Sequence, residues 1–168
     1  MTYMKRVVVL LAVTLFLALT SCPAQDKFPY EIYDPRTLSE LVERSSSTPE
    51  LKGAKQLMID AKPFYSAVRI KYTGKSRPLT EERKKLFKLW QEALQVDPQI
   101  LATLDSEYLF KECEKEYWIP VQKPVASYFP KELKIGDTIT LYLMLVGGVK
   151  TPTSWDVVFF VNEFRKYE

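Results

Sequence analysis

Two long stretches near the C-terminus constrain the fold most, because apolar residues recur in them at every second position. In "TITLYLMLV" (138–146) the alternate residues from Ile139 to Leu145 would share one face of a β-strand. "WDVVFFVNEF" (155–164) has the same character, and both stretches become apolar on both faces toward their middles. That pattern is typical of strands covered on both sides. We therefore predict two central strands joined by a long hairpin loop over 147–154.

A shorter hairpin is predicted just before these strands. "EYLFKEC" and "EYWIPVQ" alternate as strands do and flank a turn at Glu114-Lys115. Pro120 has no N–H to donate to a neighbouring strand, so we expect it at a sheet edge or at a bulge. "PVASYF" (124–129), between the two hairpins, favours a helical turn.

The preceding part of the chain carries mainly helical signals. A short helix is expected over 37–44, and a second from Thr48 to Pro63, where apolar residues recur at spacings of three and four. The strongest helix follows Thr80, a good N-cap whose next residues are acidic. Asp97-Pro98 starts another short helix. Only "AVRIKYTG" (67–74) alternates as a strand does in this half.

These elements predict an α+β fold with N-terminal helices followed by a small antiparallel β-sheet. The predicted strands are short enough to curl into an OB-like or SH3-like partly closed barrel packed on the helix after Thr80. We expect a single domain over 37–168, mainly helical over 37–104 and mainly β over 105–168. The length suits one domain with its own core.

The first residues have the order of a secretory signal peptide. Lys5 and Arg6 precede an apolar run from Val7 to Leu19, and small residues follow it. The run is shorter than the roughly twenty residues that a membrane-spanning helix needs. An uncleaved anchor or a buried helix is the alternative. We therefore assign 1–21 to a signal peptide and 22–36 to a polar, proline-containing tether.

"LTSC" (19–22) resembles the lipobox of bacterial lipoprotein precursors, with an aliphatic residue, two small residues and a cysteine. The resemblance covers only this leader. It implies cleavage before Cys22, a diacylglycerol on its sulfur and an exported protein anchored to a membrane of the cell envelope. Cleavage after Ala24 is the alternative, and would leave a soluble periplasmic or secreted protein.

Composition excludes several kinds of chemistry. The chain has no histidine and two cysteines, so neither a Ser-His-Asp triad nor an imidazole or multi-cysteine zinc site can be built. No glycine-rich phosphate-binding motif occurs. We therefore expect no catalytic residue, no metal and no cofactor. The formal charge of +3 falls to +1 once Lys5 and Arg6 are removed, which argues against nucleic acid as a partner.

Two groups of residues are candidate binding features. One is a set of aromatic residues that could stack on a sugar or hold a peptide: Trp118, Tyr142 and Trp155. The other is a basic patch that could face anionic headgroups or acidic polymers: Lys75, Arg77, Arg83, Lys84 and Lys88. For each group the alternative is structural, a core filled with aromatic residues and a solvated helix face.

Three functions follow from these features. The first is a lipid-anchored, non-enzymatic envelope module that binds a protein, a peptide or a glycan. The second is a structural or assembly accessory that docks on an anionic membrane or envelope polymer through the basic helix face. The third, and least supported, is a hydrolase that uses carboxylates between Asp105 and Glu116.

Overall fold

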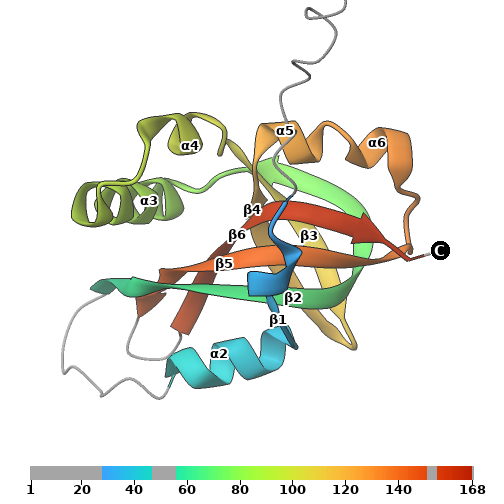
Figure 1. Cartoon of the computed structure of the whole chain (residues 1–168), viewed down its shortest axis with the longest axis horizontal. Helices are drawn as coiled ribbons and strands as arrows, with labels where there is room; N and C mark the ends of the chain where they lie inside the picture. Colours follow the sequence, from blue (N-terminus) through green and yellow to red (C-terminus); the bar gives the residue numbers. More distant parts are fainter. Residues whose placement is uncertain (1–27, 47–55, 151–154, 168) are drawn as a thin grey trace, which may run out of the picture.

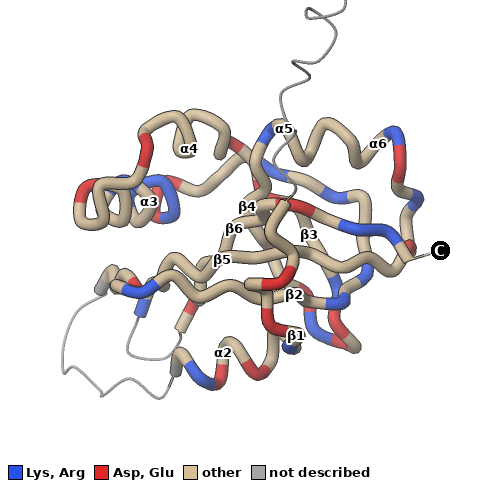
Figure 2. The backbone as a smooth tube through the Cα atoms, viewed as in Figure 1, with Lys and Arg blue, Asp and Glu red and all other residues tan. Residues whose placement is uncertain are grey.

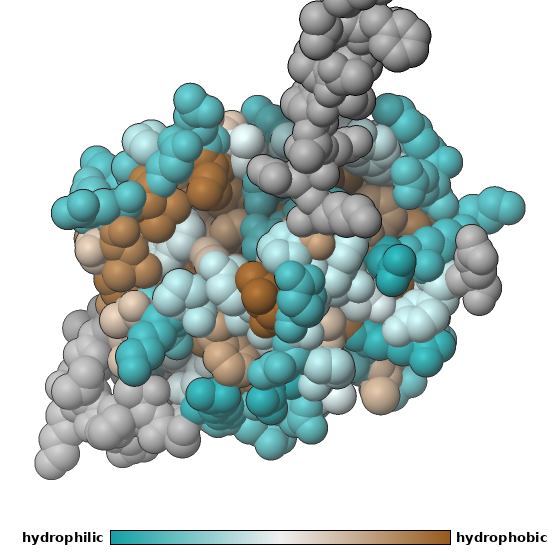
Figure 3. Space-filling view, viewed as in Figure 1, coloured by the Kyte–Doolittle hydropathy of each residue, from teal (hydrophilic) through white to brown (hydrophobic). Residues whose placement is uncertain are grey.

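The structure is a computed structural model that describes residues 28–46, 56–150 and 155–167. It is a mixed α+β fold dominated by a six-stranded sheet. In the view of Figure 1, α2 lies below the sheet, α3 and α4 lie at one end of it, and α5 and α6 lie above it. The largest apolar area of the face seen in Figure 3 lies over α3 and α4.

The sheet is partly ring-like but is not a barrel. β2 (Gln56–Pro78), β3 (Ser106–Glu112) and β4 (Lys115–Val121) form an antiparallel meander, and β5 (Thr138–Lys150) and β6 (Trp155–Lys166) form a hairpin. β5 also pairs with β2 along most of its length, so the sheet curves back toward β4. β4 and β6 pair only between Val121 and Val161, in parallel orientation. The ring of strands is therefore not closed by a continuous ladder of hydrogen bonds between these two strands. The short β1 (Asp34–Arg36) adds to β2, also in parallel.

Two apolar clusters lie on opposite faces of the β5–β6 hairpin. Ile139, Leu141 and Leu143 belong to the larger cluster, which also contains residues of α2, α5 and α6, and Leu145 packs against it. This confirms the predicted face of β5. The intervening Met144 joins the second cluster, which α3 covers. β5 is therefore covered on both faces and paired on both edges, as a central strand should be.

The helix predicted after Thr80 is confirmed. α3 (Glu81–Leu94) begins where the Thr80 hydroxyl accepts a hydrogen bond from the Arg83 N–H at 3.4 Å. It buries Leu86, Phe87 and Trp90 against the sheet. The expected short helices are present as α2 (Leu38–Ser46) and α4 (Pro98–Ala102), and the helical turn expected over 124–129 corresponds to α5 (Lys123–Ala126). A further short helix that the sequence did not predict, α6 (Phe129–Glu132), follows it.

The helix predicted from Thr48 to Pro63 is wrong over 56–63, where the chain is the first part of β2. Residues 48–55 lie outside the described residues. This part of β2 pairs with β5: Leu57 is opposite Val149, Met58 is opposite Gly148, and Ile59 is opposite Gly147. A partner distant in sequence therefore overrides the local helical spacing, which tertiary context often does. With β2 in place, 37–104 is not mainly helical, and the prediction of N-terminal helices ahead of the sheet is not supported.

Two boundaries also differ from the sequence-based expectation. Part of the expected tether is folded onto the domain, as a 3₁₀ turn η1 (Tyr30–Ile32) followed by β1, with Tyr33 buried between them. The expected loop over 147–154 begins later, because β5 continues through Lys150. Pro120 lies inside β4, opposite Glu107, on a strand whose other edge meets β6 only at Val121. That position is consistent with the expected edge location.

Candidate functional site

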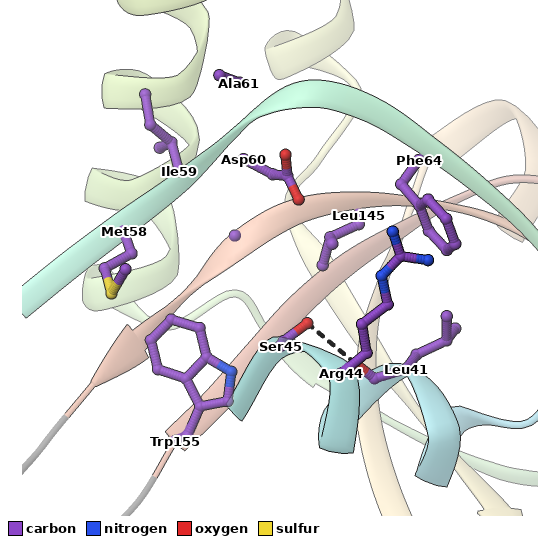
Figure 4. A pocket seen from close by; sticks show the side chains of 11 residues that line it. Leu41, Arg44, Ser45, Met58, Ile59, Asp60, Ala61, Phe64, Leu145 and Trp155 are labelled. Carbon is purple, nitrogen blue, oxygen red and sulfur yellow. Dashed lines mark hydrogen bonds between the residues drawn. The ribbon is translucent and has the colours of Figure 1, made fainter. Parts of the chain in front are cut away.

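Trp155 lines a cavity of about 280 Å³ between α2 and the strands β2, β5 and β6, which we call the α2 pocket. Figure 4 shows its side chains, contributed by all four elements. The walls combine apolar side chains, among them Leu41, Phe64 and Leu145, with polar surface of about the same extent. Arg44 and Asp60 bring opposite charges to the same cavity. A concave site in which polar groups lie beside apolar side chains can orient a ligand of mixed character.

The α2 pocket exists because two paired strands are irregular at the same level. β2 is irregular between Ile59 and Phe64, and β5 between Leu145 and Gly147. A Cβ on Gly147 would collide with the Met58 carbonyl oxygen, and its φ of 149° lies where side chains are rarely accommodated. A Cβ on Gly148 would lie 2.9 Å from the Trp155 ring. The glycine pair therefore lets β2 and the indole approach β5.

The indole N–H of Trp155 is buried and has no hydrogen-bond partner among the described residues. In Figure 4 the nitrogen lies on the side of the ring that faces α2. Leaving such a donor unpaired costs free energy, which a ligand acceptor would recover. On the opposite side of the pocket, the Arg44 guanidinium lies over the Phe64 ring at 4.4 Å from its centroid.

The helix that forms one wall of this pocket is held at its N-terminus by two carboxylates. Thr37 and Glu40 form a capping box, since each side chain accepts the other's backbone N–H, at 2.9 and 3.1 Å. These hydrogen bonds hold the pKa of Glu40 below its ordinary value. Glu112 of β3 accepts from the backbone N–H groups of Leu38 and Ser39, at 2.8 and 3.0 Å. α2 is thereby fastened to the sheet through the helix dipole and these hydrogen bonds.

Trp118 lies away from Trp155, in a cleft where β4 and β6 diverge. The Arg77 guanidinium covers its ring at 4.1 Å from the centroid. Arg83 of α3 bridges the two strands. It donates to the Trp118 carbonyl at 2.6 Å on β4 and to both Asp156 carboxylate oxygens, at 3.0 and 3.1 Å, on β6. The cleft is thus occupied by side chains that connect the unclosed strands.

The predicted basic patch is largely neutralised. Arg77 and Arg83 both donate to the fully buried Glu107 carboxylate, at 2.8 and 2.9 Å. Lys84 pairs with Glu81 at 2.7 Å, and Lys88 approaches Glu92 at 3.9 Å. Lys75 is exposed on β2, one residue after the irregular Gly74. Figure 2 accordingly shows basic and acidic segments together along α3.

Tyr142 lies in a third place, a groove of about 350 Å³ that we call the tyrosine–arginine groove. It is lined by Tyr30, Tyr33, Pro35, Arg36, Ala67, Arg69, Thr140, Tyr142 and Tyr167. The rings of Phe28, Tyr30 and Tyr33 pack around the Tyr142 ring at centroid distances of 5.6, 4.8 and 5.3 Å. Burial raises the pKa of both Tyr33 and Tyr142, so both hydroxyls are neutral at physiological pH. The three predicted aromatic residues therefore line three separate cavities and do not form one face.

Four of the five acidic residues from Asp105 to Glu116 have structural partners among the described residues. Besides Glu107 and Glu112, Asp105 pairs with Lys123 at 3.0 Å, and this hydrogen bond holds the pKa of Asp105 below its usual value. Glu114 pairs with Lys111 at 3.0 Å. In the described part of the chain, no three acidic or cysteine side chains are arranged to hold a metal ion. Cys113 is free and exposed, at the turn between β3 and β4.

Comparison with known proteins adds no identity to these features. No protein-family model matches the chain, and no curated protein matches its sequence. Among the described helices, none has the length and apolar character required to cross a bilayer.

Sequence reasoning found Trp155 but missed the residues that make it part of a site. Arg44 and Asp60 lie in segments predicted to be helix, and nothing local indicates that they meet across a cavity. The one usable signal is Gly147-Gly148, the only adjacent glycines in the sequence, which begin the segment predicted to be a loop. Within a strand, glycine often marks a bulge or a close approach of two backbones.

Proposed function

We propose that this protein is an exported, lipid-anchored envelope protein that acts as a non-enzymatic binding module, with the α2 pocket as its ligand site. Support for the anchor comes from the lipobox-like "LTSC" that ends at Cys22. Support for binding comes from one observation above all: the buried indole N–H of Trp155 has no partner in the described part of the chain and belongs to a residue that lines a cavity. The ligand supplies the missing hydrogen-bond acceptor.

The chemistry of the pocket favours a peptide or a protein segment over a glycan. Leu41, Phe64 and Leu145 offer apolar surface, which matches an apolar side chain better than a hydroxyl-covered sugar. A backbone carbonyl next to such a side chain would accept from the Trp155 N–H. The volume of about 280 Å³ suits one large side chain together with part of its backbone.

The rival function, docking through a basic helix face, loses support at two of its five residues. Arg77 and Arg83 form ion pairs with Glu107, so their charges are not available to an anionic surface. A buried ion pair of this kind contributes to structure, and removing either partner is costly.

The test begins with a displayed library of random peptides panned on the mature chain. Selected peptides are titrated by calorimetry against the wild-type chain and against Trp155→Phe, which keeps an aromatic ring and removes the N–H donor. We expect the substitution to weaken binding by roughly 5- to 10-fold, the value of one hydrogen bond. In ¹H–¹⁵N spectra, the indole resonance absent from Trp155→Phe should shift on peptide addition to the wild type.

Trp118→Phe is the matched control, because Trp118 lies in the β4–β6 cleft and should leave peptide affinity unchanged. If no peptide is selected, or if every selected peptide binds Trp155→Phe as tightly as the wild type, the α2 pocket is not the ligand site.

A further inference from the structure

Two arginines and a threonine form a row across the outer face of the sheet. Arg69 on β2 is directly opposite Thr140 on β5, and Thr140 is directly opposite Arg165 on β6. Residues opposite one another in a pleated sheet project to the same face. Arg69 and Thr140 line the tyrosine–arginine groove, and Arg165 is on the same face of the next strand. Adjacent strands are about 4.8 Å apart, which puts the two arginine positions roughly 10 Å from each other.

The guanidinium groups of this row are backed by aromatic rings. Arg69 lies over the Tyr167 ring at 4.4 Å and Arg165 over the Tyr30 ring at 5.4 Å. Among the described residues, no carboxylate forms an ion pair with either arginine. Both arginines are exposed, whereas Thr140 is 8 % exposed between them. Two positive charges around one recessed hydroxyl make a site for an anionic group.

Glu163 is the acidic residue on the neighbouring strand that shares this face, opposite Tyr142, and it accepts the backbone N–H of Phe164 at 2.8 Å. Asp34 is opposite Ser66 and so projects to the other face, where it lies 3.6 Å from Arg36. Unlike Arg77 and Arg83, neither Arg69 nor Arg165 has an ion-pair partner among the described residues, so both charges can contribute to binding an external anion.

The length of chain between Cys22 and the domain indicates which anionic partner is near. Phe28, the first residue that the structure describes, packs on Tyr33 and Tyr142 beside the groove, at centroid distances of 5.2 and 5.6 Å. Five residues lie between Cys22 and Phe28, so in any conformation the two Cα atoms are at most about 22 Å apart. If the sulfur of Cys22 carries a lipid, the tyrosine–arginine groove lies within that distance of the bilayer surface.

We propose that the tyrosine–arginine groove docks on anionic phospholipid headgroups, with lipid phosphates held between Arg69 and Arg165. Tyr30 and Tyr167, 40 % and 49 % exposed, lie at the depth of the headgroups, where tyrosine rings are commonly found at membranes. This orientation rests on the lipid anchor of the proposed function, whereas the headgroup contacts themselves do not. It also places membrane binding on a different surface from the predicted helix face.

The test uses the chain from residue 22 onward with Cys22→Ser, so that no acyl chain can contribute. Sedimentation measures binding to vesicles of phosphatidylcholine alone and of phosphatidylcholine with about one third phosphatidylglycerol. We expect the protein to bind the anionic vesicles and to be released as the salt concentration rises. Arg69→Gln with Arg165→Gln should weaken binding roughly 25-fold, about 5-fold for each arginine.

Lys84→Gln with Lys88→Gln is the matched control, because it removes the same charge from the exposed face of α3. It should leave vesicle binding nearly unchanged, and both double variants should show the wild-type circular dichroism spectrum. Equal losses in the two variants, or a wild-type protein with no preference for anionic vesicles, would overturn the proposal. A missing lipid on Cys22 would instead remove the anchor while leaving this vesicle preference intact.

Discussion

At the level of single residues, buried charge explains where the sequence was misleading. Arg83 appears from its neighbours to be one member of a basic helix face, yet it is 5 % exposed and bonded to β3, β4 and β6. Glu107 lies 24 residues away, so no short-range pattern relates the two. For Trp155 the sequence is only half informative. The aromatic side chain can be read from the sequence, whereas the lack of a partner for its N–H among the described residues follows from the fold.

Glu107→Gln should destabilise the protein by about 3 kcal/mol. The substitution removes the negative charge of a carboxylate that accepts hydrogen bonds from Arg77 and Arg83. It also places an amide N–H₂ group against one of these donors or against the Thr80 N–H. Arg83 keeps Asp156, which puts the loss at the low end of the usual range. Urea unfolding followed by circular dichroism measures the change.

The control for this substitution is Glu114→Gln, at a carboxylate that is 94 % exposed and pairs only with Lys111. We expect it to change the free energy of unfolding by less than about 0.5 kcal/mol. Equal stability of the Glu107→Gln variant and the wild type would mean that the buried pair makes no net contribution.

At the level of elements, the sequence is informative where local signals are complete. Thr80, the acids after it and the apolar stripe each specify α3 within one segment, and its start is predicted to the residue. The first part of β2 has no such signal, because its strand character comes from pairing with β5 about ninety residues later. The irregularities that open the α2 pocket belong to the same long-range pairing and could not be predicted.

The turn before β5 should contribute stability that disappears in acid. Asp137 accepts the backbone N–H of Lys134 at 2.9 Å and pairs with Lys166 at 2.7 Å, and these contacts lower the pKa of Asp137. A carboxyl whose folded pKa is lowered stabilises the fold above its unfolded pKa, and this contribution is lost as the pH falls through the folded value.

Asp137→Asn should therefore be less stable than the wild type at neutral pH, and the difference should shrink below about pH 4. Urea unfolding of both proteins across the acidic range measures this. A difference that stayed constant down to about pH 2 would show that the charge of Asp137 does not stabilise the turn.

At the level of the whole molecule, the incomplete ring separates two surfaces with different chemistry. The α2 pocket is a cavity of mixed apolar and polar lining, with a buried N–H donor that has no partner among the described residues. The tyrosine–arginine groove is an exposed cationic face from which the chain leads back to Cys22. The sequence predicted an α+β domain with aromatic and basic features. It did not predict which of these face solvent, because that depends on the order and register of six strands.

The lipid anchor decides where in the cell both surfaces act, although neither the pocket nor the headgroup contacts depend on it. The most direct test is the intact mass of the mature protein purified from detergent-solubilised membranes of a bacterial host. The account predicts a chain that begins at Cys22 and carries a diacylglycerol and an acyl chain. A chain that begins at Gln25 without lipid would contradict it, because the domain would then diffuse freely and the groove would not be held near a bilayer.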